Sequence, residues 1–489
     1  RRAVSVSGTR LYDATTNAVA SDLSTHANLV GSETLNLSGT GTIASKNVGS
    51  NKTVSVGTLA LADGSNGGLA ANYTLSGGTH QLTVNQRPLN ATLARQYDGT
   101  TTAAGSDLSS FDALQGGETL TMTGSGTAAS ANVANGIAMS SNGTLALADG
   151  TGSASNYSLN STVINIAQRV LNSSGSKTYD ANTDALAAAI TLSNLVSGEA
   201  LNHSGTATIG SANAGSYTIT NLSGISIADG SGGTASNYTL TGGTHNFTVN
   251  RRAVSVSGTR LYDATTNAVA SDLSTHANLV GSETLNLSGT GTIASKNVGS
   301  NKTVSVGTLA LADGSNGGLA ANYTLSGGTH QLTVNQRPLN ATLARQYDGT
   351  TTAAGSDLSS FDALQGGETL TMTGSGTAAS ANVANGIAMS SNGTLALADG
   401  TGLASNYSLN STVINIAQRV LNSSGSKTYD ANTDALAGAI TLSNLVSGEA
   451  LNHSGTATIS SANAGSYTIT NLSGTVSYTH LRAHETTVY

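Results

Sequence analysis

The chain has 489 residues, of which only 9% are charged, and 19 basic against 26 acidic side chains leave a net charge of −7. Such sparse and evenly spread charge excludes the basic footprint of a nucleic-acid-binding protein, and the absence of cysteine excludes disulfides and thiolate chemistry. No run approaches the roughly 18 consecutive apolar residues of a membrane-spanning helix, so we expect no membrane-spanning segment.

Short segments that alternate apolar and polar residues follow one another from the N-terminus. The predicted strands of the first 86 residues are 4–7, 33–39, 53–56, 58–61, 73–75 and 82–84. Residues 23–29 are predicted as one short helical turn or a loose crossing segment. Period-two runs separated by Gly, Asn and Asp turns are typical of an all-β fold, and no segment sustains a helical period.

One motif recurs six times: an arginine, nine residues, then Tyr-Asp-Gly or Tyr-Asp-Ala. Successive tyrosines of this motif are 82 to 85 residues apart, a fixed period that indicates tandem modules. The arginines are Arg2, Arg87, Arg169, Arg252, Arg337 and Arg419, and the tyrosine–aspartate pairs are Tyr12-Asp13, Tyr97-Asp98, Tyr179-Asp180, Tyr262-Asp263, Tyr347-Asp348 and Tyr429-Asp430.

The period divides the chain into five complete modules and a truncated sixth. Their predicted bounds are 1–86, 87–168, 169–251, 252–336, 337–418 and 419–474. We expect ~80-residue β-sandwich-like modules, Ig-like or β-grasp-like, joined by almost no linker into an elongated rod. A continuous β-solenoid is the alternative, but its coil is far shorter than this repeat.

Residues 1–250 and 251–474 align without a gap and differ at three positions, Ser153/Leu403, Ala188/Gly438 and Gly210/Ser460. This is either a recent duplication of three modules or one block counted twice in assembly. Because Arg2 is already a motif arginine, we expect the chain to be a fragment of a longer array. Residues 475–489 resemble a translated sequencing adaptor, so we exclude them from the fold.

The motif tyrosines and a second set that follows asparagine include 11 of the 15 tyrosines. In a chain with 4% aromatic residues, these rings are predicted to supply much of the core. Exposed rings that stack on sugars are the functional alternative. We also expect Tyr97→Ala to unfold its own module while its neighbours persist. The second set is Tyr73, Tyr157, Tyr238, Tyr323 and Tyr407.

Single aspartates follow the motif tyrosines or precede glycine in Ala-Asp-Gly, as at Asp63, Asp149 and Asp229. Calcium needs six to eight oxygen ligands, and these carboxylates stand singly, so turn formation is favoured over calcium binding. The junction arginines are interpreted as either a clasp to an aspartate of the neighbouring module or solvated linker charges.

Enzyme signatures are missing from the repeats. The histidines of the repeats form no metal-ligand pair and do not hold one position in every module. We therefore predict no catalytic residues, no cofactor and no metal, and we predict that the protein is not an enzyme.

Residues 87–169 carry an ordered set of motifs: Arg-Pro-Leu, Tyr-Asp-Gly-Thr-Thr, Gly-Gly-Glu-Thr-Leu, Leu-Ala-Asp-Gly and Ser-Asn-Tyr-Ser-Leu. This set resembles a YDG-type module and the related MBG modules, which occur in tandem in bacterial exoproteins of the filamentous-haemagglutinin type. The resemblance extends over residues 1–474. Ala14 and Ala181 depart from it where the name-giving glycine stands.

The resemblance implies export to the surface of Gram-negative bacteria, often by two-partner secretion, and a stalk or adhesive role. It implies no binding residues. We expect a structural spacer of a secreted or cell-surface adhesin whose main partners are neighbouring modules of the same chain. Multivalent, weak binding of host glycans or proteins is the alternative.

Overall fold

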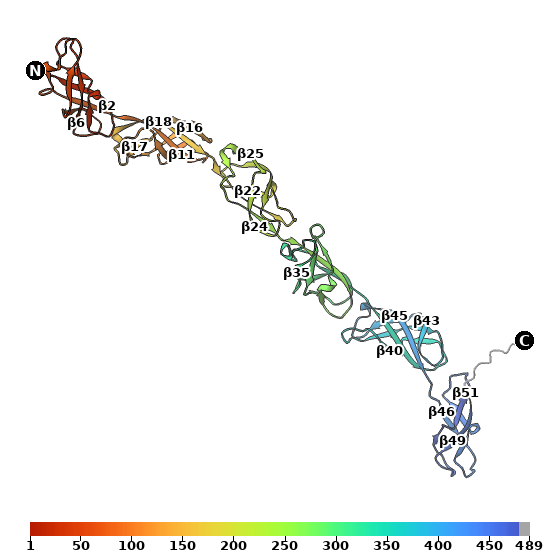
Figure 1. Cartoon of the computed structure of the whole chain (residues 1–489). Coiled ribbons are helices and arrows are strands. Elements are labelled where there is room, and N and C mark those ends of the chain that lie inside the picture. The colour runs from red at the N-terminus through yellow and green to blue at the C-terminus, as the bar shows by residue number, and fades with distance from the viewer. Residues whose placement is uncertain (479–489) are drawn as a thin grey trace. The chain divides into compact units, whose positions relative to one another are not determined.

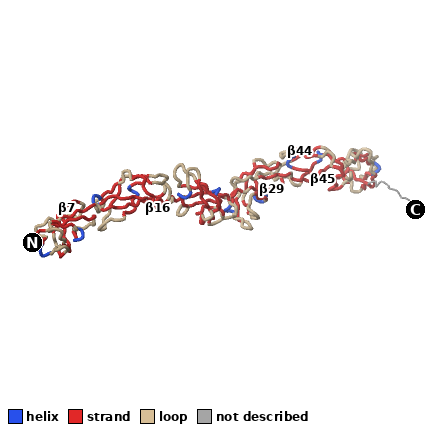
Figure 2. The backbone as a smooth tube through the Cα atoms, turned by 90° about the horizontal axis from the view of Figure 1, so that it is seen from above, coloured by secondary structure: helices blue, strands red, loops and turns tan. Residues whose placement is uncertain are grey.

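The structure is a computed structural model that describes residues 1–478. These residues form strands and loops with only three-residue 3-10 turns between them, so the predicted all-β fold of tandem modules is confirmed (Figure 2). Contacts divide the chain into two units, Arg1–Asn250 and Arg251–Tyr489. The first unit contains modules one to three.

Module one shows the element order that the other modules repeat. Its elements are β1 (Arg2–Ala3), β2 (Ser5–Leu11), β3 (Asn17–Val19), η1 (Ala20–Asp22), β4 (Thr25–Ala27), β5 (Leu35–Ser38), β6 (Thr40–Ile43), β7 (Gly49–Ser55), β8 (Ala60–Asp63), η2 (Ala70–Asn72), β9 (Tyr73–Thr74) and β10 (Gln81–Asn85).

Module two begins with one long strand where module one has two. Its elements are β11 (Arg87–Gln96), β12 (Thr102–Ala104), η3 (Gly105–Asp107), β13 (Leu108–Phe111), β14 (Leu120–Thr123), β15 (Ser125–Ala128), β16 (Ala134–Ser141), β17 (Ala146–Asp149), η4 (Ala154–Asn156) and β18 (Tyr157–Ala167).

Module three completes the first unit. Its elements are β19 (Arg169–Val170), β20 (Asn172–Thr178), β21 (Asp184–Leu186), η5 (Ala187–Ala189), β22 (Ile190–Ser193), β23 (Leu201–Ile209), β24 (Gly215–Asn221), β25 (Ile225–Asp229), η6 (Ala235–Asn237), β26 (Tyr238–Thr239) and β27 (His245–Asn250).

The second unit repeats this order. Modules four and five have the elements of modules one and two at residue numbers higher by 250, as Ser255–Leu261 corresponds to Ser5–Leu11. Module six has β46 (Asn422–Gly425), β47 (Asp434–Leu436), η11 (Ala437–Ala439), β48 (Ile440–Ser443), β49 (Asn452–Ile459), β50 (Ile469–Asn471) and β51 (Thr475–Tyr478).

A parallel pair of strands forms the centre of each complete module. In module two, β11 runs parallel to β18 from the pair Arg87/Tyr157 to the pair Gln96/Ala167 (Figure 1). The six-stranded sheet has the order β12-β15-β16-β18-β11-β13, in which β16 and β13 are antiparallel to their central neighbours. The first and last long strands of the repeat therefore meet at the middle of its sheet.

The alternation of β11 explains its burial. Leu89, Ala91 and Leu93 are buried, while the residues between them face outward or are half-buried. Ile164 and Ile166 of β18 are buried in the same way. Because successive side chains of a strand point to opposite faces, this pattern places one apolar face of the sheet in the core.

Two predicted segments differ from the structure. Within residues 23–29, Thr25–Ala27 form β4, an edge strand antiparallel to β2, and the 3-10 turn comes earlier, at Ala20–Asp22. Residues 475–478 of the excluded tail form β51, which pairs with β49, because Thr-Val-Ser-Tyr alternates as the equivalent Ile225–Asp229 does. The adaptor interpretation otherwise concerns residues 479–489, which lie outside the described residues.

The apolar cores do not end at the predicted module bounds. The cluster of module one includes Leu89, Leu120 and Tyr157 of module two. The cluster of module two likewise includes Leu171 and Tyr238 of module three. The cores of modules one and two are therefore completed by residues of the following module.

Candidate functional site at the module junctions

The motif tyrosine of one module packs against the asparagine-linked tyrosine of the next. Tyr12 of module one and Tyr157 of module two meet edge to face, with ring centroids 5.2 Å apart and planes at 77°. Both rings are almost fully buried. This is the geometry that the quadrupoles of two aromatic rings favour.

One glutamate accepts hydrogen bonds from the hydroxyl groups of both rings. Tyr12 Oη donates to Glu118 Oε1 at 2.6 Å, and Tyr157 Oη donates to Glu118 Oε2 at 2.9 Å. Lys46 Nζ of module one lies 2.6 Å from Glu118 Oε1 and 5.9 Å from the centre of the Tyr12 ring. The carboxylate is 8% exposed, so both of its oxygens are satisfied inside the junction.

The hydrogen bonds shift the ionisation of this cluster. Burial disfavours the charged carboxylate, but the hydrogen bonds from Lys46, Tyr12 and Tyr157 outweigh it, and the pKa of Glu118 lies below its ordinary value. Burial, with the hydrogen bond to Glu118 adding to it, raises the pKa of Tyr157 to about 12. Glu118 is therefore a carboxylate and Tyr157 a neutral phenol at neutral pH.

A buried asparagine holds the two modules together beside the rings. Asn156, which is 1% exposed, accepts the Val48 backbone N–H at 2.8 Å and donates to Asn47 Oδ1 at 3.0 Å. Gln86 Nε2 donates to the carbonyl oxygen of Ser155 at 3.1 Å. The loop at residues 46–49 is thus bound to module two by its backbone as well as by Lys46.

The junction arginines bind backbone carbonyl oxygens. Arg87 Nε donates to the carbonyl oxygen of Tyr12 at 2.6 Å, which links the modules through the main chain. In the next junction, Arg169 donates to the Asn194 carbonyl at 2.6 Å and to the Tyr97 carbonyl at 3.4 Å. Arg337 donates to the Tyr262 carbonyl as Arg87 does to that of Tyr12. Arg252 donates to the Asn278 carbonyl and Arg419 to the Asn444 carbonyl, as Arg169 does to that of Asn194. Arg2 lies in β1.

The motif aspartates are held within their own modules. Asp13 pairs with Arg10 at 2.8 Å and accepts the Thr15 backbone N–H at 3.0 Å, which closes the turn after the tyrosine. A basic residue two positions before the tyrosine recurs in all six copies, and it pairs with the aspartate each time. The pairs are Arg10-Asp13, Arg95-Asp98, Lys177-Asp180, Arg260-Asp263, Arg345-Asp348 and Lys427-Asp430.

The aspartates of Ala-Asp-Gly also make turn contacts. Asp63, Asp149 and Asp229 each accept a backbone N–H at the start of the following 3-10 turn, at 2.7 to 2.8 Å. Within residues 1–478, no three His, Asp or Glu side chains gather where they could hold a metal ion. These contacts account for the carboxylates by turn formation, and calcium binding stays the alternative prediction.

The junction between modules two and three repeats the ring and glutamate geometry. Tyr97 and Tyr238 meet edge to face at 5.4 Å, and their hydroxyls donate to Glu199 at 2.7 and 2.6 Å. Asn237 accepts the Val133 backbone N–H at 2.9 Å. Burial and the bond to Glu199 raise the pKa of Tyr238 to about 12.

The second unit contains the same arrangement. Tyr262 and Tyr407 meet at 5.2 Å and 78°, and both donate to Glu368, while Tyr347 donates to Glu449. Among the other tyrosines of the two recurring sets, Tyr73, Tyr179 and Tyr323 are buried, and Tyr429 is 63% exposed. Most of these rings are thus covered by protein and cannot offer a flat platform to a sugar.

Sequence reasoning missed the residues that complete the junction. Glu118 and Glu199 occupy the glutamate position of the Gly-Gly-Glu or Ser-Gly-Glu landmark, and Asn156 and Asn237 precede the second tyrosine in every copy. The recurrence of these residues in diverged modules indicates that they have a structural role. Their partners could not be predicted from the sequence, because Tyr12 and Glu118 are 106 residues apart in the chain.

The YDG domain family model matches five successive stretches of the chain, residues 2–83, 80–164, 167–246, 246–333 and 329–414. The comparison with curated proteins gives no match. Within residues 1–478, no helix has the length and apolar character needed to cross a membrane. The matched stretches follow the same period as the tyrosine junctions.

Proposed function

Because the chain belongs to the YDG domain family, we propose that it is part of the repeat region of a large secreted or cell-surface bacterial adhesin and serves there as a spacer. The observation that carries the proposal is the junction itself. A ring pair, a shared glutamate and a buried asparagine join consecutive modules, where flexible linkers would leave the modules free to reorient.

The mechanism of a spacer is mechanical. Bending the junction of modules one and two would separate Tyr12 from Tyr157 and expose the Glu118 carboxylate with its two phenol partners. Losing a hydrogen bond to a charged group in this way costs about 1.5–3 kcal/mol. Repeat proteins gain reach by adding modules.

We place this activity outside the cell, at the surface of a Gram-negative bacterium and reached by two-partner secretion. Support comes from the setting in which tandem modules of this type occur. The absence of cysteine agrees with export as an unfolded chain, because no disulfide can form before translocation. The proposal gives the repeats no catalytic role.

The missing cysteines also provide the test, since two introduced cysteines are the only sites for a spin label. The variant Thr53→Cys with Thr208→Cys labels exposed strand positions in modules one and three. We expect a narrow distance distribution between the labels, measured by pulsed electron paramagnetic resonance in the full chain. A broad distribution, like that of a flexible linker, would overturn the spacer.

Multivalent binding of host glycans or proteins remains the alternative function. The buried junction tyrosines do not favour it, because a sugar needs an open ring face. A glycan array probed with the full chain separates the two proposals. The spacer predicts a blank array, whereas saturable binding of a glycan class would support the adhesive modules.

A further inference from the structure

The two strands that carry the ends of a module lie side by side and run in the same direction. In module two, Arg87 of β11 pairs with Tyr157 of β18, and Gln96 pairs with Ala167. The start of β11 and the end of β18 therefore lie at opposite ends of the paired ladder. Tension along the chain pulls the two strands past each other, and the evenly spaced hydrogen bonds of a parallel ladder then carry the load together.

The position of this pair within the sheet supports the sharing of load. β13 and β16 flank the pair, so neither of its strands is an edge strand. The Tyr97 N–H donates to the Ala167 carbonyl at 2.9 Å and closes the ladder at its far end. Leu93 and Ile164, which pair across the ladder, are both 0% exposed. Hydrogen bonds in such a buried setting are stronger than those that compete with water.

The ladder is nearly continuous in module two and interrupted in modules one and three. Asn160 is the single residue of β18 left out of the pairing with β11, as a β-bulge. In module one, the six residues 75–80 separate β9 from β10, whereas only residues 4–6 separate the paired parts of the first strands. In module three, residues 240–244 separate β26 from β27, whereas only 171–172 separate their partners. Both of these modules therefore have an excess of three residues where module two has one.

A histidine side chain replaces main-chain pairing in the gap of module one. The Val6 N–H donates to His80 Nδ1 at 3.3 Å. The equivalent residue of module two is Ala91, which pairs with Thr162 of β18 in the ordinary ladder. The gap thus removes strand pairing from the middle of the terminal pair.

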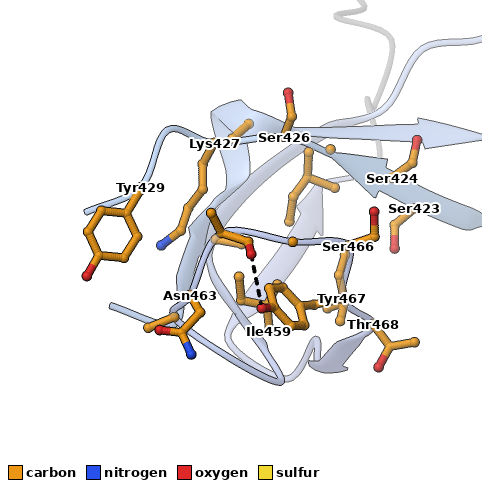
Figure 3. A pocket seen from close by; sticks show the side chains of 18 of the residues that line it. Ser423, Ser424, Ser426, Lys427, Tyr429, Ile459, Asn463, Ser466, Tyr467 and Thr468 are labelled. Atoms are coloured by element: carbon orange, nitrogen blue, oxygen red, sulfur yellow. Dashed lines mark hydrogen bonds between the residues drawn. The ribbon is translucent and has the colours of Figure 1, made fainter. Parts of the chain in front are cut away.

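Module five repeats the ladder of module two. Its β38 (Arg337–Gln346) and β45 (Tyr407–Ala417) pair in the same register, with the same bulge. Module six lies outside this comparison, because the described residues end before the position of its last strand. The side of β46 where that strand would lie is open and is lined by Ser424 and Tyr467 (Figure 3). The comparison therefore rests on the five complete modules.

We propose that the parallel terminal pair of each complete module is a force-bearing clamp, and that modules two and five, which have the longest ladder, withstand the highest tension. Modules one, three and four yield first and lengthen the chain, while modules two and five stay folded. The clamp concerns tension within a module, whereas the proposed spacer concerns bending at the junctions. The clamp rests on the proposed function only for the source of the tension, which is attachment at a cell surface.

The direction of pulling tests the clamp with a matched control. Because the chain has no cysteine, two introduced cysteines in the full chain fix the points at which DNA handles apply force in optical tweezers. Gln86→Cys with Gln168→Cys pulls module two from opposite ends of its ladder, and Gln96→Cys with Gln168→Cys pulls it from one end; all three positions are exposed. The first pair loads many hydrogen bonds at once and the second breaks them one after another, so we expect an at least about twofold higher unfolding force for the first pair.

The interruption of the ladder is tested by pulling module three from opposite ends, through Gln168→Cys with Arg251→Cys. We expect a lower unfolding force than for Gln86→Cys with Gln168→Cys. Insertion of two glycines after Asn160 gives module two an excess of three residues, and it should lower the unfolding force of this module toward that of module three.

Equal forces in the two pulling directions would overturn the clamp. A force for module three as high as that for module two, or no effect of the glycine insertion, would overturn the assignment of the highest load to the longest ladder. The label distances of the variant with Thr53→Cys and Thr208→Cys measure bending at the junctions separately, so the clamp and the spacer can fail independently.

Discussion

The two junctions of the first unit share a set of contacts, called here the junction frame, which consists of the two tyrosines, the glutamate and the buried asparagine. They differ in the residues around this frame. Both place two tyrosine hydroxyls on one glutamate and hold a neighbouring loop through a buried asparagine. Only the first junction adds Lys46 to the glutamate, because Ala131 occupies the equivalent position in module two. The frame therefore does not depend on a compensating cation.

The residue after the motif aspartate differs in a complementary way. Ala14 has a positive φ of 64° and faces Gly116 of module two, whose added Cβ would come within 2.8 Å of the Ala14 Cβ. Gly99 instead faces Val196 of module three, whose Cγ1 would lie 2.8 Å from an added Cβ. In each junction a glycine of one module thus faces a larger residue of the other module. The contact surfaces of adjoining modules are therefore complementary in size for each pair of modules.

The largest effect is expected from removing the glutamate. Glu118→Ala with Glu368→Ala leaves two buried phenols without an acceptor, which we expect to cost about 3 kcal/mol per junction. The Val48 amide, which is bound to Asn156, should then exchange its hydrogen about 100-fold faster. Glu199→Ala with Glu449→Ala should accelerate the Val133 amide similarly; a much smaller change there would show that the two junctions do not rest on the same contact.

The next effect concerns the matched small residue. Gly99→Ala places a Cβ against Val196 at a φ of +81°, so we expect the second junction to lose about 1–2 kcal/mol. Ala14→Gly is the control, because glycine adopts positive φ readily and faces no new contact. Exchange of the Val133 amide measures the first variant and exchange of the Val48 amide the second. Equal stability of the two variants would contradict pairwise matching.

Alkaline pH should open both junctions. The folded pKa of Tyr157 is raised to about 12 from an ordinary 10.0, so its contribution to stability is complete below pH 10 and is lost as the pH rises through about 12. Tyr238 behaves alike in the second junction. Tyrosinate absorbance and amide exchange should therefore change together in this range. Tyr157→Phe should reduce the dependence of the first junction, where burial and the hydrogen bond to Glu118 also raise the pKa of Tyr12, and leave that of the second junction unchanged.

The smallest effect is expected from Lys46→Ala, which gives the first junction the character of the second. Lys46 is 42% exposed, so its pairing with Glu118 is screened by salt. We expect a slight acceleration of Val48 amide exchange at low salt that disappears at high salt. If Lys46→Ala accelerates Val48 amide exchange as much as Glu118→Ala does, the tyrosine–glutamate contacts of the first junction need the Lys46 cation.

Acid pH offers a related check on Lys46. The pKa of Glu118 is lowered, so its contribution is present above the ordinary glutamate value of 4.5 and is lost as the pH falls through the folded value. Lys46→Ala removes one of the hydrogen bonds that lower this pKa. The acid transition of the first junction should therefore move to higher pH in that variant, as followed by exchange of Val48.

Much of the architecture could be predicted because it rests on local patterns. The tyrosine period set the module bounds, and alternation such as that of Leu89, Ala91 and Leu93 indicated the strands. The turn role of Asp13 followed from the preferences of its side chain for nearby backbone groups. Residues 23–29, predicted as one short helical turn or a loose crossing segment, instead contain the edge strand β4, because pairing with β2 outweighs a weak local preference.

The module expected to unfold on Tyr97→Ala shows the limit of such patterns. Tyr97 belongs to the core of module two, yet its ring packs on Tyr238 of module three. We now expect its loss to weaken both modules. Amide exchange in the two modules measures this, and an effect confined to module two would restore the earlier view.

The sequence by itself determined the repeat, the β fold, the turn aspartates and the tyrosines as packing residues. Only the tertiary structure decided that the motif tyrosine faces the following module, that a glutamate joins the two rings, and that the junction arginine binds a carbonyl group. The reason is distance along the chain. Spacing within a strand or turn limits contacts between near neighbours, whereas Tyr12 and Glu118 meet across 106 residues through the placement of two whole sheets.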